Sequence, residues 1–127
     1  MVSEEIIGDR ITEIVSAFVP VFNSEAETEV YPYAVYEQDV TPIRDKAEIR
    51  GYSSSLTLAV YSKDYDEART IMLAVRQSVD GGMGTGMRAI RTGSREECII
   101  GVWSIQDTYT IRQINSLISN DNGTIRA

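Results

Sequence analysis

The chain has 127 residues with 19 acidic and 12 basic side chains, and its formal net charge of −7 argues against nonspecific binding to nucleic-acid phosphates. It contains no histidine and one cysteine, Cys98, which excludes histidine-based catalytic triads, intrachain disulfides and cysteine-pair metal sites. The length and the 43% hydrophobic content predict one globular domain over residues 1–127.

The first predicted element is a helix from Ser3 to Val19. Ser3 is a candidate N-cap residue, because its hydroxyl can accept a hydrogen bond from a free N–H of the first turn. Pro20 ends the helix, since the residue before a proline avoids the α conformation. The apolar residues that recur on one helical stripe are Ile7, Ile11, Ile14, Val15 and Phe18.

Two strands are predicted next, separated by a polar segment. Aromatic and β-branched residues over Val30 to Tyr36 indicate a strand, with Pro32 placing its start at a sheet edge or a kink. We interpret Asp39 to Gly51, which contains Pro42, as a long excursion between strands, part of it extended. Apolar and polar residues then alternate from Ser54 to Ser62, which predicts the second strand.

A second helix is predicted from Tyr65 to Val79. Asp64 and Glu67 have the spacing of a capping pair at its start, and Gly81 stands where a C-cap glycine is expected. Leu73 lies on the opposite side from the apolar stripe and is expected at the surface. The stripe consists of Ala68, Ile71, Met72, Val75 and Val79.

The C-terminal third is predicted to form further strands. Asp80 to Gly86 is interpreted as a flexible connection. Two strands, Met87 to Thr92 and Cys98 to Ile105, are expected to be joined by a turn at Gly93 to Glu97. A further strand is expected over Tyr109 to Ile118, and the SNDNGT segment after it is expected to turn.

This order of elements predicts an α+β fold with an antiparallel or mixed sheet of about four strands and two amphipathic helices packed on one face. The other face would be partly apolar through Ala59, Tyr61, Ile100 and Val102. No predicted element covers it, so we expect a large partner there, a second copy of the chain being the simplest candidate.

The segments that resemble sites of chemistry have simpler interpretations, so we expect no enzyme, no cofactor and no metal site. The glycines between Gly81 and Gly86 follow a helix and precede a strand, which is the reverse of a phosphate-binding loop. The acidic cluster at Asp64 to Glu67 is interpreted as helix capping, and the one at Glu25 to Glu29 as a solvated loop. Cys98 has no histidine to activate it and is expected to be a buried, unreactive thiol.

Aromatic and basic residues occur together in the centre of the chain. Such pairs stack on single-stranded bases in other proteins, yet the acidic residues around them argue against nucleic-acid binding here. Tyrosines that pack on one side and donate hydrogen bonds on the other are typical of protein interfaces. The candidate subunit or partner interface is therefore Tyr31, Tyr33, Tyr36, Arg44, Lys46, Tyr61 and Leu73.

The stretch from residue 3 to residue 81 shows a family resemblance. An N-terminal helix leads to the strand VYPYAVY, then a polar excursion, the strand LTLAVY and the turn SKDYDEA into the second helix. This pattern resembles the small tail-completion, or tail terminator-like, proteins of long-tailed bacteriophages and prophages. The resemblance covers the stretch up to Gly81, and residues 107–127 do not follow the family pattern.

The resemblance implies a structural virion protein without catalytic residues or cofactor. Such a protein forms a homo-oligomeric ring, expected to be a hexamer, that caps the tail tube and joins it to the head connector. It would be made in the bacterial host cytoplasm and would reside at the tail–head junction. It would bind no specific nucleic-acid sequence, no membrane and no small-molecule substrate.

Two other functions stay open. One alternative is that the chain is another head–tail connector component. The other is that it is a small bacterial ligand-binding or regulatory α+β module. The acidic start of the chain predicts no secretory signal, and no apolar run reaches the length of about 18 residues that spans a membrane.

Overall fold

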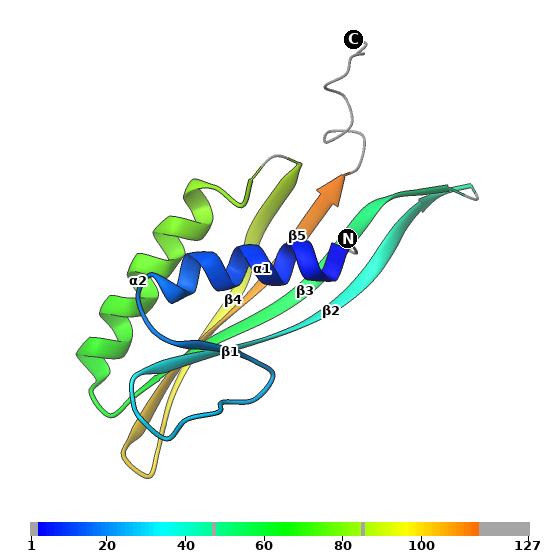
Figure 1. Cartoon of the computed structure of the whole chain (residues 1–127). Helices are drawn as coiled ribbons and strands as arrows, with labels where there is room; N and C mark the ends of the chain where they lie inside the picture. Colours follow the sequence, from blue (N-terminus) through cyan, green and yellow to red (C-terminus); the bar gives the residue numbers. More distant parts are fainter. Residues whose placement is uncertain (1–2, 47, 85, 115–127) are drawn as a thin grey trace.

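The computed structural model describes residues 3–46, 48–84 and 86–114. In this part of the chain, two helices and five strands occur, and both helices lie on the same face of the sheet (Figure 1). The α+β class is therefore confirmed, with one strand more than expected. The elements are α1 (Ser3–Ser16), β1 (Val21–Asn23), β2 (Tyr33–Asp45), β3 (Glu48–Ser62), α2 (Tyr65–Gly81), β4 (Met87–Ile99) and β5 (Val102–Ile114).

The strand order in the sheet is β1-β2-β3-β5-β4. The short β1, which the sequence did not predict, pairs with β2 in parallel at Ala34 to Tyr36. The other neighbours are antiparallel, and they form the two long hairpins β2–β3 and β4–β5. The sheet is thus mixed, with β1 and β4 at its two edges.

The polar segment Asp39 to Gly51 is hairpin rather than loop, which corrects the sequence prediction. Asp39 pairs with Ser55 and Asp45 with Glu48, so β2 and β3 extend well beyond the predicted strands. Most side chains toward the hairpin tip are exposed on both faces of the sheet, so the apolar alternation that signals a strand is missing there. Cross-strand backbone pairing holds this part of the sheet together.

The β4–β5 hairpin also departs from the prediction. Gly93 to Glu97 lies inside β4, and the turn is formed by Ile100 and Gly101. The predicted strand Cys98 to Ile105 therefore runs across the turn. The mistake has a physical cause: the edge strand β4 is exposed and polar on both faces near its end, whereas an apolar residue occupies the turn. Of the strand predicted over 109–118, residues up to 114 belong to β5 and the rest lie outside the described residues.

Helix α1 ends at Ser16, three residues before the predicted end. The chain continues in a tighter turn, in which the N–H groups of Phe18 and Val19 both donate to the carbonyl of Val15. Phe18 is 43% exposed and does not belong to the buried stripe, whereas Val19 is buried.

Helix α2 starts with a capping arrangement close to the predicted one. The Asp64 carboxylate accepts a hydrogen bond from the N–H of Asp66 at 2.9 Å. Glu67 does not bond the backbone of the cap directly, because the Ser62 hydroxyl stands between them. That hydroxyl accepts from the N–H of Asp64 at 3.0 Å and donates to Glu67 at 2.6 Å. The C-cap is Gly82 instead of Gly81.

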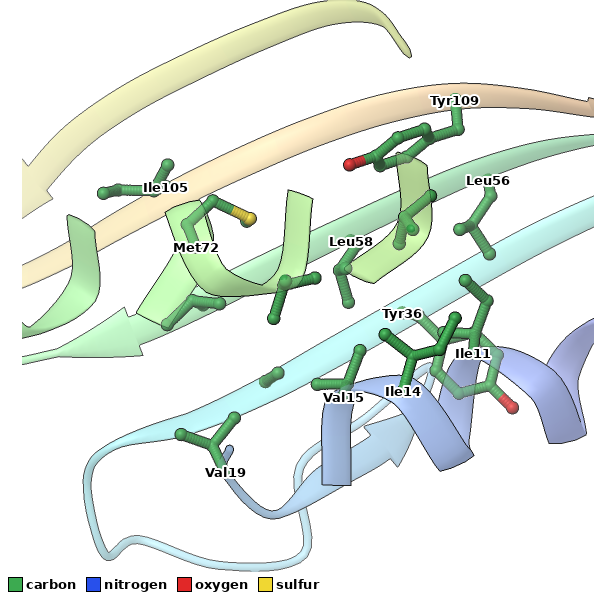
Figure 2. Packing of buried hydrophobic residues seen from close by; sticks show 14 of the residues in the cluster. Ile11, Ile14, Val15, Val19, Tyr36, Leu56, Leu58, Met72, Ile105 and Tyr109 are labelled. Atoms are coloured by element: carbon green, nitrogen blue, oxygen red, sulfur yellow. The ribbon is translucent and has the colours of Figure 1, made fainter. Parts of the chain in front are cut away.

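The core lies between the two helices and the sheet face beneath them (Figure 2). Ile11, Ile14 and Val15 of α1 pack toward Tyr36 of β2, and Met72 of α2 packs above β3 and β5. Each fully buried aliphatic side chain of this kind contributes roughly 1.5–3 kcal/mol to folding. The residues of β3 and β5 that complete this core are Leu56, Leu58, Val60, Ile105, Tyr109 and Ile111.

Candidate interaction surface

The face of the sheet that points away from the helices is open. Because strand residues alternate between faces, the neighbours of the buried Leu58 and Val60 on β3, such as Thr57 and Tyr61, point to the other side. Neither helix covers this open face (Figure 1). It is the surface for which the sequence predicted a partner.

An aromatic cluster occupies one end of the open face. Tyr33 and Tyr61 are cross-strand neighbours with ring centroids 5.2 Å apart. Tyr31 stacks on Tyr33, also at 5.2 Å, and Phe22 meets Tyr33 edge-on at 6.3 Å. All four side chains are half-buried, so large apolar rings and polar hydroxyls are presented together. This combination is typical of the centre of protein–protein interfaces.

A cation–π contact lies at the border of the aromatic cluster. The ammonium group of Lys63 lies 5.6 Å from the centroid of Tyr31, a cation–π contact that fixes one border of the cluster. Partial burial raises the pKa of Tyr33, and the neighbouring Tyr31 raises it further. Tyr33 therefore keeps its proton at physiological pH.

A shallow hollow continues the cluster toward β4. Its volume is about 190 Å³, and Tyr61 forms the wall that it shares with the aromatic cluster. The hollow spans β3, β5 and β4 and leads to the end of the β4–β5 hairpin. Its lining residues are Tyr61, Glu97, Ile99, Val102, Ser104 and Gln106.

The tip of the β4–β5 hairpin is apolar and exposed. Ile99 is 59% exposed and Ile100 is 97% exposed. Ile100 has φ 51° and Gly101 has φ 77°, so both turn residues are left-handed. Two-residue hairpin turns of this kind favour Asn-Gly, and the left-handed conformation costs a β-branched residue roughly 1–2 kcal/mol. Strain and apolar exposure at one position are characteristic of sites retained for contact.

The cysteine beside this tip is placed differently from the expectation. Cys98 is exposed, although the sequence predicted a buried thiol. It lies near the end of the edge strand β4.

The structure brings together only part of the predicted interface. Tyr31, Tyr33 and Tyr61 form the aromatic cluster. Tyr36 is 6% exposed on the opposite face, where a Cβ added to Gly8 of α1 would lie 3.0 Å from its hydroxyl, so it is a core residue and not an interface residue.

The other predicted residues lie away from the cluster. Arg44 and Lys46 are exposed at the tip of the β2–β3 hairpin, at the far end of the sheet from Tyr61 (Figure 1). Leu73 is 42% exposed on α2. Sequence reasoning missed Phe22. It placed Ile100 on the uncovered face but inside a strand, whereas Ile100 lies in the turn between β4 and β5.

Two further depressions occur in the described part of the chain. A groove of about 360 Å³ runs between the helices and includes Arg10, Phe18 and Gly82. A polar hollow of about 350 Å³ on the open face is lined by Glu37, Asp39 and Thr57 with their neighbours.

Neither a metal cluster nor a membrane helix is found where the structure is described. No group of three or more His, Cys, Asp or Glu side chains among residues 3–46, 48–84 and 86–114 is arranged to hold a metal ion. None of the helices in these ranges has the length and apolar character needed to cross a membrane.

Comparison with known proteins yields a structural match. A solved structure shares this fold. It is a chain of the "Virion of native gene transfer agent (GTA) particle", with a TM-score of 0.56 over 82% of this chain and 84% of that chain. The sequence identity is 13%, so the likeness is one of fold. No family model matches the sequence, and no curated protein matches it.

Proposed function

We propose that the chain is a structural component of a phage-like particle, in which it completes the tail tube as a homo-oligomeric ring and joins it to the head connector. Two independent observations support this proposal. The sequence from residue 3 to residue 81 resembles tail-completion proteins, and the fold matches a chain of a gene transfer agent virion over 82% of this chain.

The observation that carries the proposal is the open sheet face with its aromatic cluster. Tyr31, Tyr33 and Tyr61 stack on one another and adjoin a hollow that ends at the exposed Ile99 and Ile100. A surface of this composition gains free energy when another protein covers it, because apolar area leaves water while the tyrosine hydroxyls retain hydrogen bonds. A building block that works by fitting against neighbours requires such a surface.

In this proposal the protein makes and breaks no bonds and needs no cofactor. Its partners are further copies of itself, the tail tube protein and the head connector proteins. It is made in the host cytoplasm and resides at the tail–head junction of the particle. The ring number follows from the contact angle between copies, and a hexamer is expected from the family resemblance.

The proposal is tested by measuring assembly directly. Purified protein is studied by analytical ultracentrifugation and negative-stain electron microscopy across a range of concentrations, alone and with purified tail tubes. Rings, or protein bound at the ends of the tubes, are the expected result. A protein that stays monomeric at every concentration and leaves the tube ends free contradicts the proposal.

The matched variants are Tyr61→Ser in the aromatic cluster and Tyr52→Ser elsewhere on the same strand. Both remove a half-buried tyrosine from β3, so they are comparable in kind. Only Tyr61→Ser is expected to weaken assembly or binding to the tube. Equal effects of the two variants would mean that the aromatic cluster is not the contact surface.

A further inference from the structure

Two sheet edges are left without a strand partner in the described structure. β1 covers β2 only at Ala34 to Tyr36, so the outer edge of β2 is free from Glu37 onward. β4 pairs with β5 on one side and with no described strand on the other. Free edges present unpaired N–H and C=O groups and are templates for pairing with another chain.

The two edges carry opposite charges on the open face. The free edge of β2 presents Glu37 and Asp39, whereas β4 presents Arg88 and Arg95. All four side chains are exposed. Arg95 has one ion-pair partner, Glu97 at 3.3 Å, while Arg88, Glu37 and Asp39 have none among the described residues. The unpaired charges of one edge therefore complement those of the other.

The strand directions permit the two edges to meet. β2 is antiparallel to β3, β3 to β5, and β5 to β4, so β2 and β4 run in opposite directions at opposite sides of the sheet. When a second copy is placed beside the first by rotation about an axis along the strands, its β2 lies antiparallel to the first copy's β4. The alternation of strand directions then continues from one copy into the next.

The register places the opposite charges near one another. Asp39 is level, across the sheet, with Ile90, and Glu37 is level with Gly93. When a second copy stands at the same height, its Asp39 lies opposite Ile90 of the first copy, two residues along β4 from Arg88. Its Glu37 lies opposite Gly93, two residues from Arg95. Diagonal neighbours of this kind are roughly 7–8 Å apart, within reach of an arginine side chain.

Irregularities in both strands define where the pairing ends. The bulge of β4 lies between Arg91 and Gly93, level with Glu37, where the cover by β1 begins. A bulge interrupts regular backbone pairing, so the continuous ladder ends at that point, and Arg95, two residues beyond Gly93, is reached through its side chain alone. At the other end, Pro42 has no N–H to donate. The regular segments that remain available for pairing are Glu37 to Thr41 of β2 and Met87 to Arg91 of β4.

We propose that the acidic edge of β2, Glu37 to Thr41, pairs antiparallel with the basic edge of β4, Met87 to Arg91, of a second copy of this chain. The contact joins two different surfaces, so each copy uses both of its edges, and the copies form a ring where the rotation between them closes, instead of a two-fold dimer. This inference rests on the proposed self-assembly and adds a contact at the two sheet edges to the one assigned to the aromatic cluster.

Charge exchange between the two edges tests the pairing. One variant, Glu37→Lys with Asp39→Lys, makes both edges basic, and a second, Arg88→Glu with Arg95→Glu, makes both acidic. Each alone is expected to assemble at least about tenfold more weakly than wild type, because like charges meet. A mixture of the two restores opposite charges at every contact and is expected to form rings with alternating subunits.

A quadruple variant that carries all four substitutions is the decisive control. Its net charge equals that of the wild type, yet each edge has changed sign, so it is expected to assemble with itself and not with wild type. The variant Glu27→Lys with Glu29→Lys changes the charge of a loop as much as the β2 variant changes its edge, and it is expected to assemble normally. Thermal unfolding establishes that each variant is folded before assembly is measured.

The outcomes separate this inference from the proposed function. If the wild type forms rings and the double variants form them equally well, the edge pairing is wrong while the proposed function stands. Folded double variants that fail to assemble, with no rescue in the mixture or in the quadruple variant, also overturn the pairing. A wild type that is monomeric with and without tail tubes overturns both.

Discussion

Arg76 of α2 holds the carboxylate of Asp107 of β5 with two hydrogen bonds, from Nε to Oδ2 at 2.7 Å and from Nη2 to Oδ1 at 2.8 Å. Asp107 is fully buried, and its hydrogen bonds raise the pKa of Arg76. The same Nη2 donates to Ser94 of β4 at 2.9 Å. One guanidinium group thus connects the helix to both strands of the β4–β5 hairpin.

The first prediction concerns the removal of this guanidinium. Arg76→Ala leaves the buried Asp107 charge without its main partner and is expected to lower the free energy of unfolding by about 3–5 kcal/mol. Arg69→Ala, on the exposed side of the same helix, is the control and is expected to cost less than about 1 kcal/mol. Urea unfolding followed by the fluorescence of Trp103 measures both. A loss below about 1 kcal/mol for Arg76→Ala would show that the pair contributes little.

The second prediction concerns alkaline pH. Burial, together with the negative charge of Asp107, raises the pKa of Tyr109 from 10.0 to about 12. An unfolded tyrosine loses its proton near pH 10, whereas folded Tyr109 keeps it, so the stabilisation is complete below pH 10 and is lost as the pH rises toward 12. The loss is up to roughly 2–3 kcal/mol.

Tyr109→Phe is the variant that isolates this effect. It has no proton to release, so its stability is expected to fall less than that of the wild type between pH 9 and pH 11. The comparison cancels the titration of lysines and of the other tyrosines, including the raised pKa of Tyr33. Parallel pH curves for the two proteins would show that Tyr109 releases its proton as readily folded as unfolded.

The third prediction compares two leucines. Leu58 is 0% exposed at the centre of the core, and Leu73 is 42% exposed on the outer side of α2. Leu58→Ala is expected to cost about 2–5 kcal/mol, since it removes buried methyl groups and leaves a cavity. Leu73→Glu is expected to leave the monomer folded and to weaken assembly. If Leu73→Glu assembles like the wild type, Leu73 lies outside the contact.

The fourth prediction concerns the strained hairpin tip. Ile100→Asn is expected to raise stability by roughly 1 kcal/mol, because asparagine adopts the left-handed conformation more readily than a β-branched residue. A gain of this size in the free energy of unfolding corresponds to a rise of a few degrees in the midpoint of thermal unfolding. If the tip is kept apolar for contact, the same variant binds tail tubes or copies of itself more weakly. An unchanged or lower melting midpoint would argue against strain at Ile100.

The elements that could be predicted from the sequence are those in which one buried face produces a periodic pattern of apolar residues. The stripe of Ile7, Ile11 and Val15 and the alternation around Leu58 mark elements with one buried face, and both were predicted correctly. The hairpin segments Asp39 to Gly51 and Gly93 to Glu97 have mostly exposed side chains on both faces of the sheet. Cross-strand backbone pairing therefore specifies them, and no apolar period in the sequence indicates a strand there.

The candidate surface was predictable to a similar degree. The tyrosines at positions 31, 33 and 61 were found because aromatic residues in strands are conspicuous in a sequence. Tyr36 was wrongly grouped with Tyr33, although alternation places positions 33 and 36 on opposite faces of a strand. The packing of α1 decides which of these two faces is buried. The opposite charges of the two sheet edges depend on strand order, which a sequence of this kind does not specify.

The last prediction concerns the pair Tyr33 and Tyr61. Their ring centroids lie 5.2 Å apart on the open face, and a stacked or tilted aromatic pair contributes about 0.5–1.5 kcal/mol beyond the area that it buries. A double-mutant cycle with Tyr33→Ala, Tyr61→Ala and the double variant is expected to give a coupling free energy in this range. Urea unfolding of the monomer at low protein concentration measures it.

The same cycle, repeated on the assembled protein, separates a folding role from a contact role. If the aromatic cluster is buried between copies or against the tail tube, each single substitution is expected to weaken association by more than it weakens folding. Truncating an aromatic side chain at the centre of an interface typically lowers the binding free energy by about 2 kcal/mol or more. Sedimentation equilibrium gives the association free energies. Losses in association that merely equal the losses in stability would assign Tyr33 and Tyr61 to the integrity of the sheet and leave the contact surface elsewhere.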